Sequence, residues 1–199
     1  AIVEAWQLGT QSGHAIAQVL YGDYNPSGKL PMTFPRNVGQ VPLYYNHKNT
    51  GRPSLPAPGI VFWTHYQDMA NTPLYPFGYG LSYTSFDYSE PKVENSYAQN
   101  KEVSVSVMLK NTGDVSGTEV VQLYIRDIYA SVTRPVRELK GFELVNLAPG
   151  ETKLVEFTLS DTELGFYNNE GKWKVENGDF EVYVGGSSST TNASNFLLK

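Results

Sequence analysis

Histidine, cysteine and serine are considered first, because their side chains carry much of metal binding and nucleophilic catalysis. The chain has three histidines, His14, His47 and His65, and no cysteine. The histidines form neither an H-E-x-x-H motif nor an i, i+4 pair, so their spacing does not predict a metal site. The sequence also lacks the G-x-S-x-G motif of a serine nucleophile. We therefore expect no metal and no other cofactor.

Paired carboxylates would offer a second kind of chemistry, because a glycosidase holds two carboxyl groups a few ångströms apart across a cleft. Asp23, Asp68 and Asp87 lie in predicted loops or at the ends of elements. Capping and turn formation are the usual roles of aspartate at such positions. The 14 tyrosines could stack on sugar rings, but packing inside the protein explains most of them. The spacing of the carboxylates alone therefore identifies no catalytic pair.

The composition excludes some classes of partner. The 199 residues include 15 lysines and arginines against 20 aspartates and glutamates, which gives a formal net charge of −5. Nucleic acids and anionic membranes select basic surfaces, so we expect neither as a partner. No apolar run approaches the roughly 18 residues of a membrane span. Hydrophobic residues make up 40% of the chain, which is enough to build a core.

The first third of the chain has the order strand, loop, helix that is typical of an α/β layer. The apolar run at residues 1–6 predicts a buried strand, and residues 14–21 place apolar side chains on one helical face before Gly22. A buried strand needs neighbouring strands, and none follows closely. We interpret the chain as the C-terminal piece of a longer protein; an edge strand at a mature N-terminus is the alternative.

A long segment of low periodicity follows. Asn25 to Gly28 is a turn signal, and the two prolines within residues 30–36 predict an extended edge or loop. From Asn37 to Tyr79 prolines and aromatic residues recur without a regular pattern. A loop this long is usually functional or a linker, and its aromatic residues favour an ordered, packed loop.

The rest of the chain alternates with period two, which is typical of half-buried strands. Apolar residues alternate at 103–109, 121–125 and 155–159, and turns are predicted at 111–114 and 149–150. The turn at 111–114 is expected to close a hairpin. Asn177-Gly178 predicts a last hairpin between strands at 173–175 and 180–184. Residues 187–195 are expected to form a mobile hairpin before a closing edge strand.

About seven short strands in this region indicate an immunoglobulin-like β-sandwich. We place the domain boundary near Ser85: residues 1–84 form the end of an α/β domain with its long loop, and residues 85–199 form the sandwich. These patterns leave the function open between an enzyme fragment and a binding module.

Several motifs resemble one known family. The strings are GDYNPSGKLPMTFPR at 22–36, YYNHKNTGRP at 44–53 and PLYPFGYGLSYT at 73–84. They are similar to the C-terminal part of glycoside hydrolase family 3, close to the bacterial periplasmic β-glucosidases. NTG at 111–113, RP at 134–135, LKGF at 139–142 and LAPGET at 147–152 resemble the fibronectin type III-like domain that ends such enzymes. The resemblance covers essentially the whole chain.

The resemblance implies three domains in the parent enzyme: a barrel, an α/β sandwich and a fibronectin type III-like β-sandwich. The expected fold is mainly β, with that last sandwich preceded by the C-terminal piece of the α/β sandwich. In the family the catalytic aspartate and glutamate lie earlier in the chain, and neither motif is in this sequence. We therefore assign no catalytic role to Glu4, Asp23 or Asp68.

For the parent enzyme the resemblance implies retaining hydrolysis of terminal β-D-glucosyl residues. The present chain is then expected to be inactive alone and to serve as a scaffold. Its expected partners are the rest of the parent glycosidase and a β-glucoside or oligosaccharide substrate. The alternative is a non-catalytic carbohydrate-binding or adhesion module. His47, Arg52 and Asp68 are the candidates for the rim of the parent's cleft, although hydrogen bonding within the loop would also explain them. Location in the periplasm or outside the cell is implied only by the resemblance.

Overall fold

The structure is a computed structural model that describes residues 2–49, 51–52, 62–95 and 97–199. Pro53, Pro56 and Pro58 of the predicted loop lie outside these residues. The helices are α1 (Ser12–Tyr21), the 3₁₀ turn η1 (Val38–Gln40), α2 (Tyr97–Asn100) and α3 (Asp161–Leu164). The strands are β1 (Phe86–Tyr88), β2 (Lys92–Asn95), β3 (Val103–Asn111), β4 (Gly117–Asp127), β5 (Glu138–Leu147), β6 (Thr152–Leu159), β7 (Phe166–Tyr167), β8 (Trp173–Lys174), β9 (Gly178–Gly185) and β10 (Ala193–Leu198).

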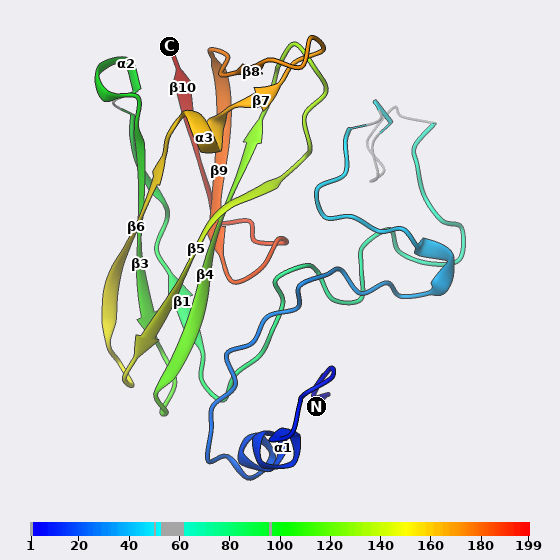
Figure 1. Ribbon diagram of the computed structural model, residues 1–199, viewed down its shortest axis with the longest axis vertical. Coiled ribbons are helices and arrows are strands. Elements are labelled where there is room, and N and C mark those ends of the chain that lie inside the picture. The colour runs from blue at the N-terminus through cyan, green and yellow to red at the C-terminus, as the bar shows by residue number, and fades with distance from the viewer. Residues whose placement is uncertain (1, 50, 53–61, 96) are drawn as a thin grey trace.

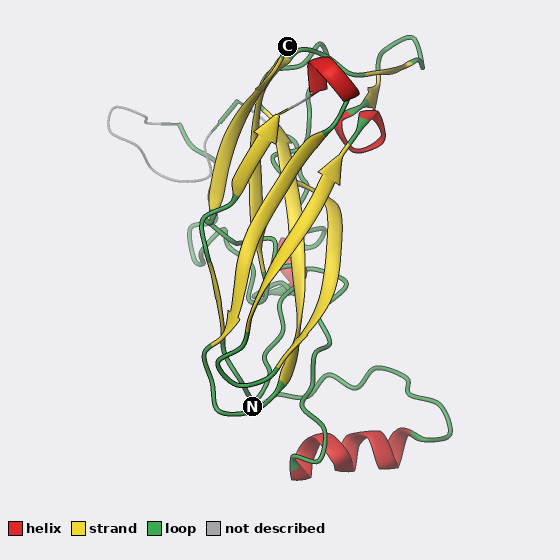
Figure 2. Ribbon diagram, turned by 90° about the vertical axis from the view of Figure 1, so that its left-hand side faces the viewer, coloured by secondary structure: helices red, strands yellow, loops and turns green. Residues whose placement is uncertain are grey.

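Eight of the described strands form a β-sandwich of two antiparallel sheets, and β7 and β8 pair separately (Figure 1). In one sheet β3 pairs with β6 along one edge and with β1 and β2 along the other. The other sheet has the order β10-β9-β4-β5. Figure 2 shows the strands running along the long axis of the molecule, with α1 beyond one end of the sandwich. The fold class expected from the sequence is confirmed: a mainly β chain with a fibronectin type III-like sandwich.

The core forms where alternating apolar rows of the two sheets face each other. In β3 every second residue from Val103 to Asn111 is buried, and β6 buries Val155, Phe157 and Leu159 in the same way. These rows confirm the predicted strands. The buried apolar cluster comprises Val103, Val105, Val107, Leu109, Val121, Leu123, Ile125, Leu147, Val155, Phe157, Leu159, Leu164, Phe180, Val182, Val184, Phe196 and Leu198.

Strand β4 departs from simple alternation because both of its faces are covered. Val121, Leu123 and Ile125 face the core, yet Gln122 and Tyr124 are buried as well. Tyr45 packs edge-on against Tyr124 at a ring distance of 5.9 Å, and Gln122 bonds to Gly78. The long N-terminal segment therefore lies against the outer face of this strand.

Two predicted hairpins are wrong. The turn after Asn111 leads from β3 to β4, but these strands belong to different sheets, so it is a crossing between sheets. Strand β8 pairs with β7, and β9 pairs with β4 and β10, so Asn177-Gly178 closes no hairpin. Strand β3 pairs with the later strand β6 in place of β4, and β8 pairs with the preceding strand β7 in place of β9. The predicted hairpin and edge strand at the end of the chain are confirmed by β9 and β10.

The predicted strand at the start of the chain is also wrong. Residues 2–6 form no strand, and Ile2 and Trp6 are 79% and 55% exposed. A buried parallel strand needs neighbouring strands to accept its backbone hydrogen bonds. Among the described residues of 7–84, the structure has no strand that could accept these bonds.

Helix α1 confirms the predicted helix and begins two residues earlier. Gly22 ends it in a left-handed conformation with φ +82°, and its N–H donates to the Val19 carbonyl. None of the residues of α1 is buried. In the part of the chain that the structure describes, no helix is both long and apolar enough to cross a membrane.

The segment from Asn25 to Thr84 runs out from the sandwich and back along two adjacent paths. Phe34 on the outgoing path forms a bridge with Tyr75 on the returning path. Leu30 N–H donates to the Tyr79 carbonyl, and Gly78 N–H donates to the Leu30 carbonyl. The region 30–36 is a loop with bends and one bridge, at Phe34, which agrees with the predicted extended edge or loop. The division of the chain at residue 84 or 85 stays a prediction, although β1 begins at Phe86.

Candidate functional site

Residues 25–84, which leave the sandwich and return to it, are called the excursion. The three rim candidates lie on it between Asn37 and Tyr79, and their side chains are exposed. The His47 carbonyl accepts a hydrogen bond of 2.9 Å from Val136 N–H of the sandwich domain. The next residue, Lys48, forms a bridge with Pro135. His47 is thus held beside the connection between β4 and β5.

The described side-chain contacts of His47 and Arg52 lie within the excursion. His47 Nδ1 lies 3.2 Å from the Lys48 carbonyl oxygen. The Arg52 guanidinium lies over the Phe62 ring, 5.8 Å from its centroid, and Asp68 lies in a bend. Among the contacts that the structure describes, none links two of these three residues directly.

The carboxylates that the sequence left unassigned remain without a catalytic arrangement. Glu4 Oε1 accepts a hydrogen bond from Trp6 N–H two residues away, and Asp23 is exposed after the end of α1. Within the described residues, no group of three or more His, Asp or Glu side chains is arranged to hold a metal ion.

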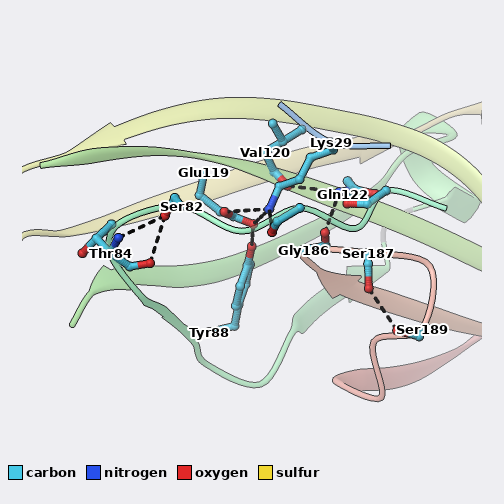
Figure 3. A network of polar contacts seen from close by, with 12 residues as sticks. Lys29, Ser82, Thr84, Tyr88, Glu119, Val120, Gln122, Gly186, Ser187 and Ser189 are labelled. Atoms are coloured by element: carbon cyan, nitrogen blue, oxygen red, sulfur yellow. Dashed lines mark hydrogen bonds and ion pairs between the residues drawn. The ribbon is translucent and has the colours of Figure 1, made fainter. Parts of the chain in front are cut away.

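A buried polar network connects the N-terminal segment with the sandwich (Figure 3). Lys29 Nζ lies 3.0 and 3.1 Å from the two carboxylate oxygens of Glu119 on β4. The same ammonium donates to the Gly80 carbonyl at 3.2 Å. The side chains of Lys29 and Glu119 are only 13% and 7% exposed, so the ion pair is largely removed from water.

Tyr88 completes this ion pair from the other sheet. Its hydroxyl donates to Glu119 Oε1 at 2.9 Å. Burial raises the pKa of Tyr88 far above its usual value, and the adjacent Glu119 carboxylate raises it further. The phenol therefore stays protonated and keeps donating to the carboxylate.

Gln122 forms the second part of the network and follows Glu119 on β4. Its side-chain amide donates to the carbonyls of Gly78 and Gly186 at 3.1 and 2.8 Å. Its carbonyl oxygen accepts from the Tyr124 hydroxyl at 2.5 Å. Nearby, Ser188 N–H donates to the Phe77 carbonyl at 2.9 Å. The Gln122 side chain thus connects three parts of the chain: the excursion at Gly78, strand β4, and the loop after β9 at Gly186.

The chemistry of this network is that of a structural junction. Each charge has an opposite charge or a hydrogen-bond partner, which is the requirement for burying polar groups without a large penalty. Sequence reasoning missed Lys29 and Glu119. Glu119 stands two residues before Val121, in phase with the core-facing row, and a carboxylate in an apolar row signals a buried partner.

An apolar groove of about 630 Å³ lies on the excursion itself. Its walls come from residues 31–35 and 41–46, closed at one side by Phe77. Tyr45 stacks on Phe77 with ring centroids 4.4 Å apart. Met32, Val41 and Tyr44 remain 52–64% exposed along it.

Comparison with known proteins gives two family matches. Residues 1–83 match the glycosyl hydrolase family 3 C-terminal domain, and residues 119–188 match the fibronectin type III-like domain.

Relatives match the chain over nearly its whole length. A periplasmic β-glucosidase of Salmonella typhimurium is 49% identical over 199 residues, which is 100% of this chain and 26% of the relative. A β-xylosidase of Formosa agariphila is 49% identical over 94% of this chain and 25% of its own length. The crystal structure of a β-glucosidase from Listeria innocua in complex with glucose superposes with a TM-score of 0.89 at 42% identity, covering 98% of this chain and 27% of that one.

The chain spans about a quarter of the length of these relatives. With the two family matches and the sandwich topology, this likeness assigns the chain: it belongs to glycosyl hydrolase family 3, and it carries that family's C-terminal domain followed by a fibronectin type III-like domain.

Proposed function

We propose that the chain is the C-terminal part of a retaining β-glucosidase that hydrolyses terminal β-D-glucosyl residues. The observation that carries the proposal is the likeness along the whole chain to proteins named β-glucosidases, at 49% identity in the Salmonella relative and a TM-score of 0.89 in the Listeria structure. In a retaining enzyme one carboxylate attacks the anomeric carbon and a second serves as acid and then as base.

In this proposal the chain itself is a scaffold and has no activity alone. The carboxylates with the best-defined contacts support this role. Glu119 is paired with Lys29, Glu138 with Arg134, and Glu163 closes the capping box of α3. A catalytic carboxyl group would have to be free to meet a substrate.

The partner in this proposal is the remainder of the parent glycosidase: its barrel and the N-terminal part of its α/β sandwich. The uncovered apolar side chains of the first residues support it. Leu20 and Tyr21 on α1 are 63% and 85% exposed, and Ile2 is 79% exposed. Large apolar side chains gathered at one end of a chain usually mark a surface that another part of the protein covers.

A chimera tests the proposal. The corresponding C-terminal quarter of the Salmonella periplasmic β-glucosidase would be replaced by this chain, and turnover of an aryl β-glucoside and an aryl β-xyloside would be measured. We expect the chimera to hydrolyse the β-glucoside within about tenfold of the intact relative. We expect the truncated relative and the isolated chain to show no turnover above background.

Two results would contradict the proposal. Turnover by the isolated chain that survives repurification would show that it carries its own catalytic groups. An inactive, folded chimera, together with heat of binding between the isolated chain and gluco-oligosaccharides at millimolar concentration, would favour a carbohydrate-binding or adhesion module.

We propose in addition that His47, Arg52 and Asp68 line the rim of the parent's cleft. Their exposure on an excursion that is anchored beside β5 supports this role. Alanine at each position in the chimera should raise KM severalfold while changing kcat less than about twofold. Unchanged KM in all three variants would leave these residues with the role of holding the loop.

The proposed location of the parent enzyme is the periplasm or the exterior of the cell. The name of the Salmonella relative, a periplasmic β-glucosidase, supports export. Fractionation of the source cells, with an antibody against the sandwich, should recover the protein outside the cytoplasmic fraction.

A further inference from the structure

Two groups of contacts attach the excursion of residues 25–84 to β4 and to the start of β5, and hydrogen bonds from Asn25 to Ser116 and from Ser188 to Phe77 add to them. At the first, Lys29, Gly78 and Gly80 contact Glu119 and Gln122 of β4. At the second, the Tyr45 hydroxyl accepts from Leu139 N–H at the start of β5, and His47 bonds to Val136. Elsewhere the described part of the segment exposes apolar side chains such as Val41 and Tyr44.

The first attachment allows very little displacement. A Cβ atom at Gly78 would lie 2.0 Å from Gln122 Oε1, and a Cβ atom at Gly80 would lie 2.3 Å from the Gly28 carbonyl oxygen. The two paths of the excursion therefore approach each other at backbone distance, and Gly78 lies against the Gln122 side chain. A side chain at Gly80 would meet backbone, whereas a side chain at Gly78 would force Gln122 to move.

The charge at this attachment is costly to bury unless it is paired. Lys29 and Glu119 are 13% and 7% exposed, and the carboxylate receives a further hydrogen bond from Tyr88. Replacing a buried ion pair by uncharged groups of similar shape is often neutral for stability, whereas removing one partner is strongly destabilising. A buried pair is therefore a weak stabiliser, but any other docking position would leave its charges unpaired.

We propose that Lys29 and Glu119 are positioning residues, which fix the docking position of residues 25–84 on the sandwich and thereby the place of the rim segment that follows. The first attachment leads directly along the chain to the second, where His47 leaves the sandwich surface. The consequence for catalysis rests on the proposed function, whereas the docking role does not.

The test uses a variant that removes the charges of Lys29 and Glu119 and keeps the hydrogen bond that Tyr88 donates. Lys29→Met with Glu119→Gln leaves an amide oxygen to accept from Tyr88. The matched control is Arg126→Met with Glu181→Gln, which removes a half-exposed ion pair at 3.1 Å between β4 and β9 and leaves an acceptor for Tyr183. The single variant Lys29→Met should unfold at a clearly lower temperature, because it strands a buried carboxylate.

Amide hydrogen exchange reports docking without reference to activity. Ser188 N–H of the sandwich donates to the Phe77 carbonyl and Val136 N–H to the His47 carbonyl, so exchange of these two amides reports whether the excursion is docked. In the double variant we expect their exchange to be at least tenfold faster, while the β3 and β6 amides keep their rates and the unfolding temperature stays within about 3 °C. The control variant should leave all these values unchanged.

The same variants in the chimera extend the test to catalysis. The double variant should lower kcat/KM at least tenfold, mainly through KM, and the control should not. Exchange at Ser188 and Val136 as slow as in the unaltered chain would overturn the proposal, as would equally faster exchange throughout β3 and β6. If the unaltered chimera is inactive but the exchange result is as expected, the proposed function fails and the positioning role stands.

Discussion

At the scale of single residues, Asp127 offers a prediction about pH. This carboxyl group ends β4 and is 7% exposed. Burial raises its pKa from 3.8 to about 6; Glu176 and Glu138 add to the rise, and Arg134 opposes it. The folded protein therefore binds this proton more tightly than the unfolded chain. The free energy of unfolding should fall as the pH rises from about 4 to about 6.

Asp127→Asn should remove most of this dependence and stabilise the protein at pH 7 by on the order of 2 kcal/mol. Urea unfolding between pH 4 and pH 8 measures both effects. Asp87→Asn, an exposed position on β1, is the matched control and should leave the pH profile unchanged. A variant at Asp127 that is less stable at pH 7 would mean that attraction to Arg134 outweighs the cost of burial.

Gly78 gives a second prediction at this scale, with Gly150 as its control. Both glycines have positive φ, +78° and +75°, but only Gly78 has a neighbour in the space of a Cβ atom. Gly150→Ala should cost about 1 kcal/mol for its backbone conformation alone. Gly78→Ala should cost about 3 kcal/mol, because Gln122 must also move and lose its hydrogen bonds. Equal losses in urea unfolding would argue against the close packing at Gly78.

At the scale of elements, α3 is a helix of four residues that depends on its first turn. Ser160 Oγ accepts from Thr162 N–H at 3.2 Å, and Glu163 Oε2 accepts from Ser160 N–H at 2.8 Å. This capping box is visible in the sequence as S-x-x-E. Ser160→Ala should lower the free energy of unfolding by about 1 kcal/mol, and the exposed Thr162→Ala by much less. Similar losses in thermal unfolding would mean that the cap contributes little.

The same scale shows how far sequence patterns reach. Strands β3 and β6 and helix α1 were predictable, because each carries a complete apolar row with its own period. The hairpin at Asn177-Gly178 was not, because Gly178 pairs with Leu198 and starts a strand. The true local hairpin joins β7 and β8, with Asn168 Oδ1 accepting from Glu170 and Lys172 N–H. Turn residues indicate that the chain reverses, whereas strand partners depend on the whole sandwich.

The candidate site was less predictable than the fold for a related reason. His47, Arg52 and Asp68 could be named as exposed polar residues of an aromatic loop, and their role as rim residues stays a prediction. Lys29 and Glu119 stand 90 positions apart in the sequence. Only the packing of the excursion on β4 brings them together. Glu119 in an apolar row indicated that a partner exists but not which residue it is.

At the scale of the whole molecule, the predicted boundary at residues 84 and 85 can be set against the unit that folds cooperatively. Helix α1 buries no residue, so removal of residues 1–24 should change the free energy of unfolding of the sandwich by less than about 1 kcal/mol. Removal of residues 1–84 would instead uncover Gln122 and Tyr124 on β4 and take Lys29 away from Glu119.

Burial of Tyr124 and its aromatic contact with Tyr45 are worth about 3 kcal/mol together, so the chain of residues 85–199 should be less stable than that of residues 25–199 by about this amount. Urea unfolding of the two shortened chains, followed by circular dichroism, measures the difference. Equal stability would make residue 85 the start of an independent sandwich. A loss of the expected size would mean that the excursion belongs to the folding unit of the sandwich, although its sequence matches the preceding domain of the family.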